Sequence, residues 1–183
     1  LSGTQETMAS AVHRLFQRLR LGMGTAALLS PAAPDDPPVQ VVAHQDADDP
    51  GDWVELCNVG TNPVDVSGWF LSDSSTDLKK YTIPDAPQSI IPGNGYLVLT
   101  EADHFGTNVF GTNGFAFSEL GDEIILSSGL NGTQTSFRTS VDFGATERNI
   151  TLGRHPLSDG NTDFTAMTTP TMGAPNAAPL VGP

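Results

Sequence analysis

The sequence is poor in cysteine, in positive charge and in long apolar runs. Cys57 is the only cysteine among 183 residues, so no disulfide can form within the chain. Eight Lys and Arg residues stand against 21 Asp and Glu residues, which gives a formal net charge of −13. Such a surface repels phosphate backbones and argues against nucleic-acid partners. No apolar run approaches the roughly 18–20 residues that a membrane-spanning helix needs.

The residue patterns of common catalytic sites are also missing. The chain has no nucleophile elbow of the G-x-S-x-G type, no P-loop and no CxxC pair. Its histidines are scattered, without the spacing of a transition-metal site: His13, His44, His104 and His155. Cys57 lies in an acidic segment, where a reactive thiolate would not be stabilised. We therefore expect a protein that is not an enzyme.

The first 38 residues differ from the rest of the chain. Residues 1–24 have apolar side chains at spacings of three and four, which predicts one amphipathic α-helix. Residues 25–38 form a Pro/Ala-rich linker that favours an extended chain. A helix this short needs a surface to pack against. We expect it to act as an assembly arm that docks through five apolar side chains: Met8, Val12, Leu15, Phe16 and Leu19.

From residue 39 to 176 the pattern changes to short alternating runs separated by Gly, Pro, Asn and Asp clusters. This predicts an all-β sandwich or barrel of about 7–9 strands, followed by a tail at 177–183. The residues expected in or beside its core are Val54, Leu56, Trp69, Leu97, Leu99, Ile125 and Phe143. The predicted strands are 39–44, 53–59, 64–72 with a bend at 67–68, 80–84, 95–100, 114–117, 122–128, 134–143 and 150–154.

Several segments within 39–176 occur in the order and spacing of one known family. They are DWVELCN (52–58), PVDVSGW (63–69), LSD (71–73), IPGNGYLVL (91–99), GDEIIL (121–126), GR (153–154) and PTMGAPN (170–176). Together they resemble the lamin-tail domain, which implies an immunoglobulin-like β-sandwich that binds other molecules and has no catalytic residues. The chain shows neither the long heptad rod nor the CaaX box of a nuclear lamin, so it is more similar to the bacterial exported members.

The resemblance implies an extracellular or cell-surface location and protein partners, which could include copies of the chain itself. Two functional hypotheses follow. The first is a structural or adhesive module that assembles through its N-terminal arm. The second is an accessory binding domain of a larger exported hydrolase or surface protein.

Two acidic stretches are candidates for binding a hard cation. Asp46, Asp48, Asp49 and Asp52 gather on one turn, where carboxylates could hold Ca²⁺. The second stretch is 72–77, with Asp73 and Asp77. The alternative in both cases is a solvated loop between two strands. We expect no other cofactor.

Overall fold

The computed structural model describes residues 39–42, 51–58, 60–110, 114–145, 147, 150–159 and 161–181. Three short helical segments lie in this part of the chain: η2 (Pro87–Ser89), the π-helix η3 (Glu101–Phe105) and α2 (Thr107–Phe110). The strands are β1 (Val39–Val42), β2 (Trp53–Cys57), β3 (Val64–Asp65), β4 (Phe70–Ser72), β5 (Tyr81–Thr82), β6 (Ile90–Ile91), β7 (Tyr96–Thr100), β8 (Gly121–Leu130), β9 (Thr133–Gly144), β10 (Thr151–Pro156) and β11 (Thr162–Ala166). The predicted helix 1–24 and linker 25–38 lie outside the described residues.

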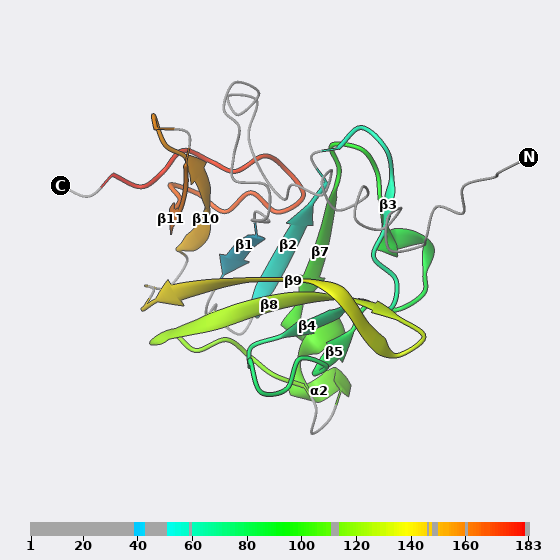
Figure 1. Ribbon diagram of the computed structural model, residues 1–183. Helices are drawn as coiled ribbons and strands as arrows, with labels where there is room; N and C mark the ends of the chain where they lie inside the picture. The colour runs from blue at the N-terminus through cyan, green and yellow to red at the C-terminus, as the bar shows by residue number, and fades with distance from the viewer. Residues whose placement is uncertain are drawn as a thin grey trace, which may run out of the picture.

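Antiparallel pairing joins the strands into two main sheets that stack as a sandwich (Figure 1). One sheet has the order β11-β10-β1-β2-β7 and the other the order β5-β4-β8-β9, while β3 and β6 form a separate pair. In Figure 1 the long β8–β9 hairpin crosses in front of β2 and β7. The predicted all-β sandwich is confirmed. The prediction missed β6, which has only two residues, and β11.

The hydrophobic core lies between the two main sheets. Its side chains come from alternate positions, such as Val54 and Leu56 on β2 and Ile124 and Leu126 on β8. Each such side chain contributes about 1.5–3 kcal/mol when it leaves water. Six of the seven predicted core residues belong to this cluster: Val54, Leu56, Trp69, Leu97, Leu99 and Phe143.

Ile125, the seventh, is buried on the other face of β8. Because side chains alternate along a strand, the inward positions of Ile124 and Leu126 turn Ile125 outward. On that outer face the Ser75 amide of the loop 73–80 donates to Glu123, two residues from Ile125. Ile125 is fully buried but does not belong to the cluster between the sheets. The run of three apolar residues does not show which of them faces the core.

The segment 114–117, which the alternation predicts as a strand, is not one. Its described backbone is an extended loop, and its amides bond to other parts of the chain instead of a strand ladder. The Phe115 amide donates to the Phe105 carbonyl, and the Phe117 amide donates to a carboxylate oxygen of Asp52. Phe115 and Phe117 are buried; the Phe115 ring stacks on Phe105, and the Phe117 ring packs against Phe105 at a tilt. The alternation of apolar residues in 114–117 therefore comes from two buried phenylalanine rings on a loop and not from a strand.

The bend predicted at 67–68 separates β3 from β4. Gly68 has φ +75°, a left-handed conformation that glycine adopts without strain. Gly68 also lies against Gly129. A Cβ atom added to Gly129 would be only 2.0 Å from the Gly68 carbonyl oxygen. The chain therefore leaves the pair β3–β6 and enters the four-stranded sheet at this bend.

The C-terminal segment 168–181 packs along the five-stranded sheet. Met167 forms a bridge with Pro179, and the Leu180 amide donates to the Ala166 carbonyl. The Asn176 side chain donates to the Arg154 carbonyl on β10. The segment therefore continues the sheet beyond β11 and covers part of its outer face.

Candidate functional site

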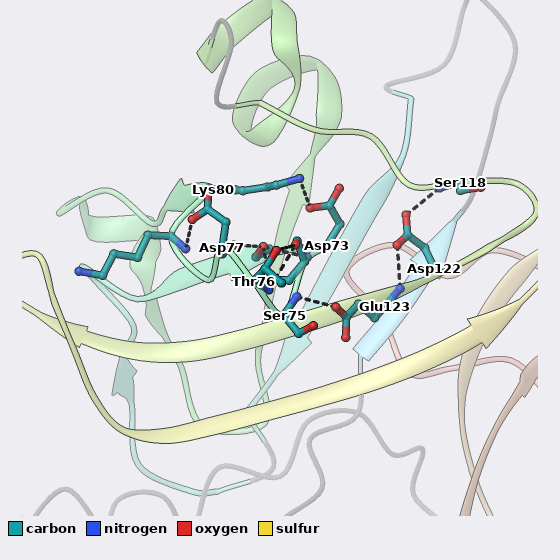
Figure 2. Close-up of polar contacts among 11 residues, drawn as sticks. Asp73, Ser75, Thr76, Asp77, Lys80, Ser118, Asp122 and Glu123 are labelled. Carbon is teal, nitrogen blue, oxygen red and sulfur yellow. Dashed lines mark hydrogen bonds and ion pairs between the residues drawn. The ribbon is translucent and has the colours of Figure 1, made fainter.

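Polar groups gather in the loop between β4 and β5, which is the second acidic stretch of the sequence (Figure 2). The Ser72 hydroxyl donates to the Asp77 carbonyl at 2.5 Å, and the Ser74 amide donates to the Ser72 hydroxyl at 3.0 Å. The Lys79 amide donates to the Asp77 carboxylate at 3.2 Å. These bonds close the loop on itself, so Asp77 stabilises the turn.

The other carboxylates beside this loop also have partners in the protein. Asp73 pairs with the Lys80 ammonium at 2.6 Å, and the Ser75 amide donates to Glu123 at 2.6 Å. Figure 2 shows these groups pointing toward separate partners. In the part of the chain that the structure describes, no three His, Cys, Asp or Glu side chains come together as a metal site. Asp73 and Asp77 thus bond within the loop, and Glu123 of β8 holds the loop against the start of that strand.

Asp52 from the first acidic stretch belongs to the interior. Its side chain is 2% exposed, and one carboxylate oxygen accepts the Phe117 amide at 2.6 Å. The Glu101 amide donates to the Asp52 carbonyl at 2.7 Å. Asp52 therefore connects β2 to the loop 114–117 and to η3. Its place in an acidic run did not predict this role.

The remaining predicted site residues lie outside the described residues. The calcium candidates among them are Asp46, Asp48 and Asp49, and the assembly candidates are Met8, Val12, Leu15, Phe16 and Leu19. Both the cation site and the assembly arm stay predictions.

A buried acid that the sequence analysis did not single out lies on β2. Glu55 is 2% exposed, on the face of the five-stranded sheet opposite Val54 and Leu56. It stands between Gln40 of β1 and Val98 of β7 in the sheet register. The Gly173 amide of the C-terminal segment donates to its carboxylate. Glu55 therefore connects the sheet to the segment that covers it.

Burial dominates the electrostatics at Glu55. It raises the pKa of the carboxyl from 4.5 to about 7, although the bond from Gly173 acts in the opposite direction. Burial likewise raises the pKa of Tyr96 to about 12, and the neighbouring Cys57 and Glu55 add to the shift. The sequence carried no local signal of this burial, because the contact that covers Glu55 comes from Gly173, more than one hundred residues later.

The cysteine and one histidine have structural surroundings. Cys57 is 4% exposed on β2. The Nδ1 atom of His104 accepts the Thr100 amide at 3.0 Å, and partial burial lowers the pKa of its ring. Both side chains help to fix the sheet and η3.

These features define a class: an immunoglobulin-like β-sandwich whose described polar side chains mainly hold loops in place. The comparison with protein families makes the assignment specific, since the model of the Lamin Tail Domain matches residues 33–142. The chain belongs to the lamin tail domain family. This is a non-catalytic type of domain, and it indicates a protein-interaction module. No curated protein and no solved structure matches the chain.

Proposed function

We propose that the chain is a non-catalytic structural or adhesive module of an extracellular or cell-surface protein, with self-assembly through its N-terminal arm. The observation that carries this proposal is the family match to an immunoglobulin-like interaction domain. The acidic charge supports it, since −13 disfavours nucleic acid and leaves protein partners. None of the helices in the described ranges is long and apolar enough to cross a membrane.

The proposed assembly contact uses the apolar stripe of residues 1–24. Burying such side chains contributes roughly 1.5–3 kcal/mol each at best. Ordering the helix and the linker costs conformational entropy, which opposes docking. The balance favours docking only where a matching apolar surface is present. Fully extended, the linker 25–38 spans up to about 45 Å, which is enough to reach a neighbouring sandwich.

A charge introduced into this stripe tests the arm in the full chain. Leu15→Asp places a carboxylate on the apolar side of the predicted helix, and Gln17→Asp places one on the opposite side. We expect Leu15→Asp to lower the mass measured by light scattering across a concentration series, and Gln17→Asp to leave it unchanged. Deleting residues 1–38 should have the same effect as Leu15→Asp. An unchanged oligomer distribution after deletion would show that the arm does not assemble the protein.

A further inference from the structure

The strand β9 ends the four-stranded sheet, and one of its edges is open among the described residues. Only β8 pairs with it in the sheet order β5-β4-β8-β9. The β11 edge of the other sheet differs, because the C-terminal segment pairs beside the end of that strand. The free edge of a strand presents unpaired N–H and C=O groups that another strand can bond. β9, the longest described strand, offers an extended edge of this kind (Figure 1).

This edge has few of the features that usually prevent strand addition. Proteins guard edge strands with proline, lysine, bulges or inward-pointing charges. β9 contains neither proline nor lysine. Its irregular pairing with β8 is confined to the turn end, between Ser127 and Gly129. From Arg138 to Gly144 the ladder is continuous, so this half of the strand presents a regular edge.

The side chains of the regular half are arranged around Ser140. On the outer face Arg138 and Asp142 lie two residues to either side of it, and both are exposed. On the core face Phe137 and Val141 are only partly buried against the core. The strand therefore has one cation and one anion at equal distances from Ser140, and apolar side chains that still reach solvent.

We propose that β9 is the interface for a second copy of this chain, paired antiparallel with Ser140 opposite Ser140 of the partner subunit. In this register Arg138 lies opposite Asp142 of the partner subunit, and twofold symmetry repeats the ion pair. On the core face Phe137 lies opposite Phe143 of the partner subunit, an arrangement that favours aromatic contact. The two four-stranded sheets would join into one continuous sheet.

Other symmetric registers lose this complementarity. Side chains keep their faces only when the pairing shifts in steps of two residues. In a register centred on residue 139 or 141, Arg138 and Asp142 lie opposite serine or glycine of the partner subunit. In a register centred on Arg138 or Asp142, that residue lies opposite the same charge of the partner subunit. Charge complementarity therefore selects the register centred on Ser140.

The charges on β9 lack opposite charges across the strand pair within one copy. Asp142 stands opposite Glu123 of β8, which is a like charge, and Arg138 stands opposite Ser127. A second copy would place a guanidinium beside Asp142. Since the chain carries a net charge of −13, unspecific contact between copies is repulsive, and a defined ion-pair register favours this one contact. The inference rests on the proposed self-association, but its contact does not involve residues 1–38.

Charge reversal in the full chain tests the register. Arg138→Glu and Asp142→Arg each place like charges opposite one another twice, so each should weaken dimerisation about tenfold or more. An equimolar mixture of the two variants should associate again, because every opposed pair is then of opposite sign. The double variant Arg138→Asp with Asp142→Arg should also associate. The control is Asp85→Arg, a charge reversal of an exposed loop residue outside β9. Sedimentation velocity gives the dissociation constant, and circular dichroism checks that each variant is folded.

The outcomes separate this inference from the assembly arm. Recovery in the mixture, after loss in each single variant, supports the β9 contact whatever Leu15→Asp does. Association of either folded single variant at the wild-type strength overturns the β9 contact, as does a mixture that stays dissociated. If the β9 variants associate as wild type does while Leu15→Asp is dissociated, assembly through the arm is supported and the β9 contact is rejected.

Discussion

Replacing Glu55 by glutamine should stabilise the protein at neutral pH and have little effect in acid. Burial raises the pKa of this carboxyl in the folded chain from 4.5 to about 7. Below about pH 4.5 the group is protonated in both the folded and the unfolded chain. Between pH 4.5 and 7 the unfolded chain releases the proton and the folded chain keeps it, so the free energy of unfolding falls as pH rises. Above pH 7 the carboxyl is ionised in both the folded and the unfolded chain, and the free energy of unfolding falls no further.

The size of the loss follows from the shift in pKa. A shift from 4.5 to about 7 corresponds to about 3 kcal/mol between the two ends of this pH range. Glutamine cannot ionise, has nearly the same shape and can still accept the Gly173 amide. The difference in unfolding free energy between Glu55→Gln and wild type should therefore grow from near zero at pH 4.5 to about 3 kcal/mol at pH 8.

Urea unfolding at a series of pH values, followed by tryptophan fluorescence, measures this difference, since Trp53 and Trp69 are both buried. Glu147→Gln is the matched control, because Glu147 is exposed. Its difference from wild type should stay flat with pH. A Glu55→Gln variant whose stability parallels that of wild type from pH 4.5 to 8 would refute the explanation by burial.

Three substitutions test the packing, and added Ca²⁺ tests the acidic turn. Trp69→Ala should cost about 3–5 kcal/mol of unfolding free energy, and an unchanged melting temperature would remove Trp69 from the core. Gly129→Ala should cost about 1–3 kcal/mol, since its Cβ would lie 2.0 Å from the Gly68 carbonyl oxygen. Gly144→Ala, whose Cβ would meet nothing within 4 Å, should be nearly neutral in the same denaturation assay. If the acidic run 46–52 binds Ca²⁺, excess Ca²⁺ should raise the melting temperature, and equal curves in calcium and in chelator would reject the site.

The strands with clear alternation could be predicted from the sequence because one of their faces is buried between the sheets. Val54 and Leu56 on β2 and Leu97 and Leu99 on β7 all alternate with residues of the other face, and all four lie in the core. The bend at Gly68 was predictable from a glycine inside an apolar run. Local pattern therefore predicted the sandwich, and the lamin-tail resemblance supplied its type.

The remaining features depend on contacts between distant segments. Phe115 and Phe117 alternate like a strand, but their amides are bonded by Phe105 and Asp52. Glu55 is buried because a segment more than one hundred residues later lies over it. No local pattern carries such information, so the alternation of a polar residue on β2 predicts its face and not its burial.

The mass of the intact chain in solution, measured by light scattering across a concentration series, tests the central claim most directly. A self-associating lamin-tail module should rise from the 19.2 kDa of one chain toward the dimer and higher species as concentration increases. The rise should be reduced by Leu15→Asp if the arm contributes and by Arg138→Glu if β9 contributes. A mass that stays at 19.2 kDa over the whole range would contradict self-assembly by either contact.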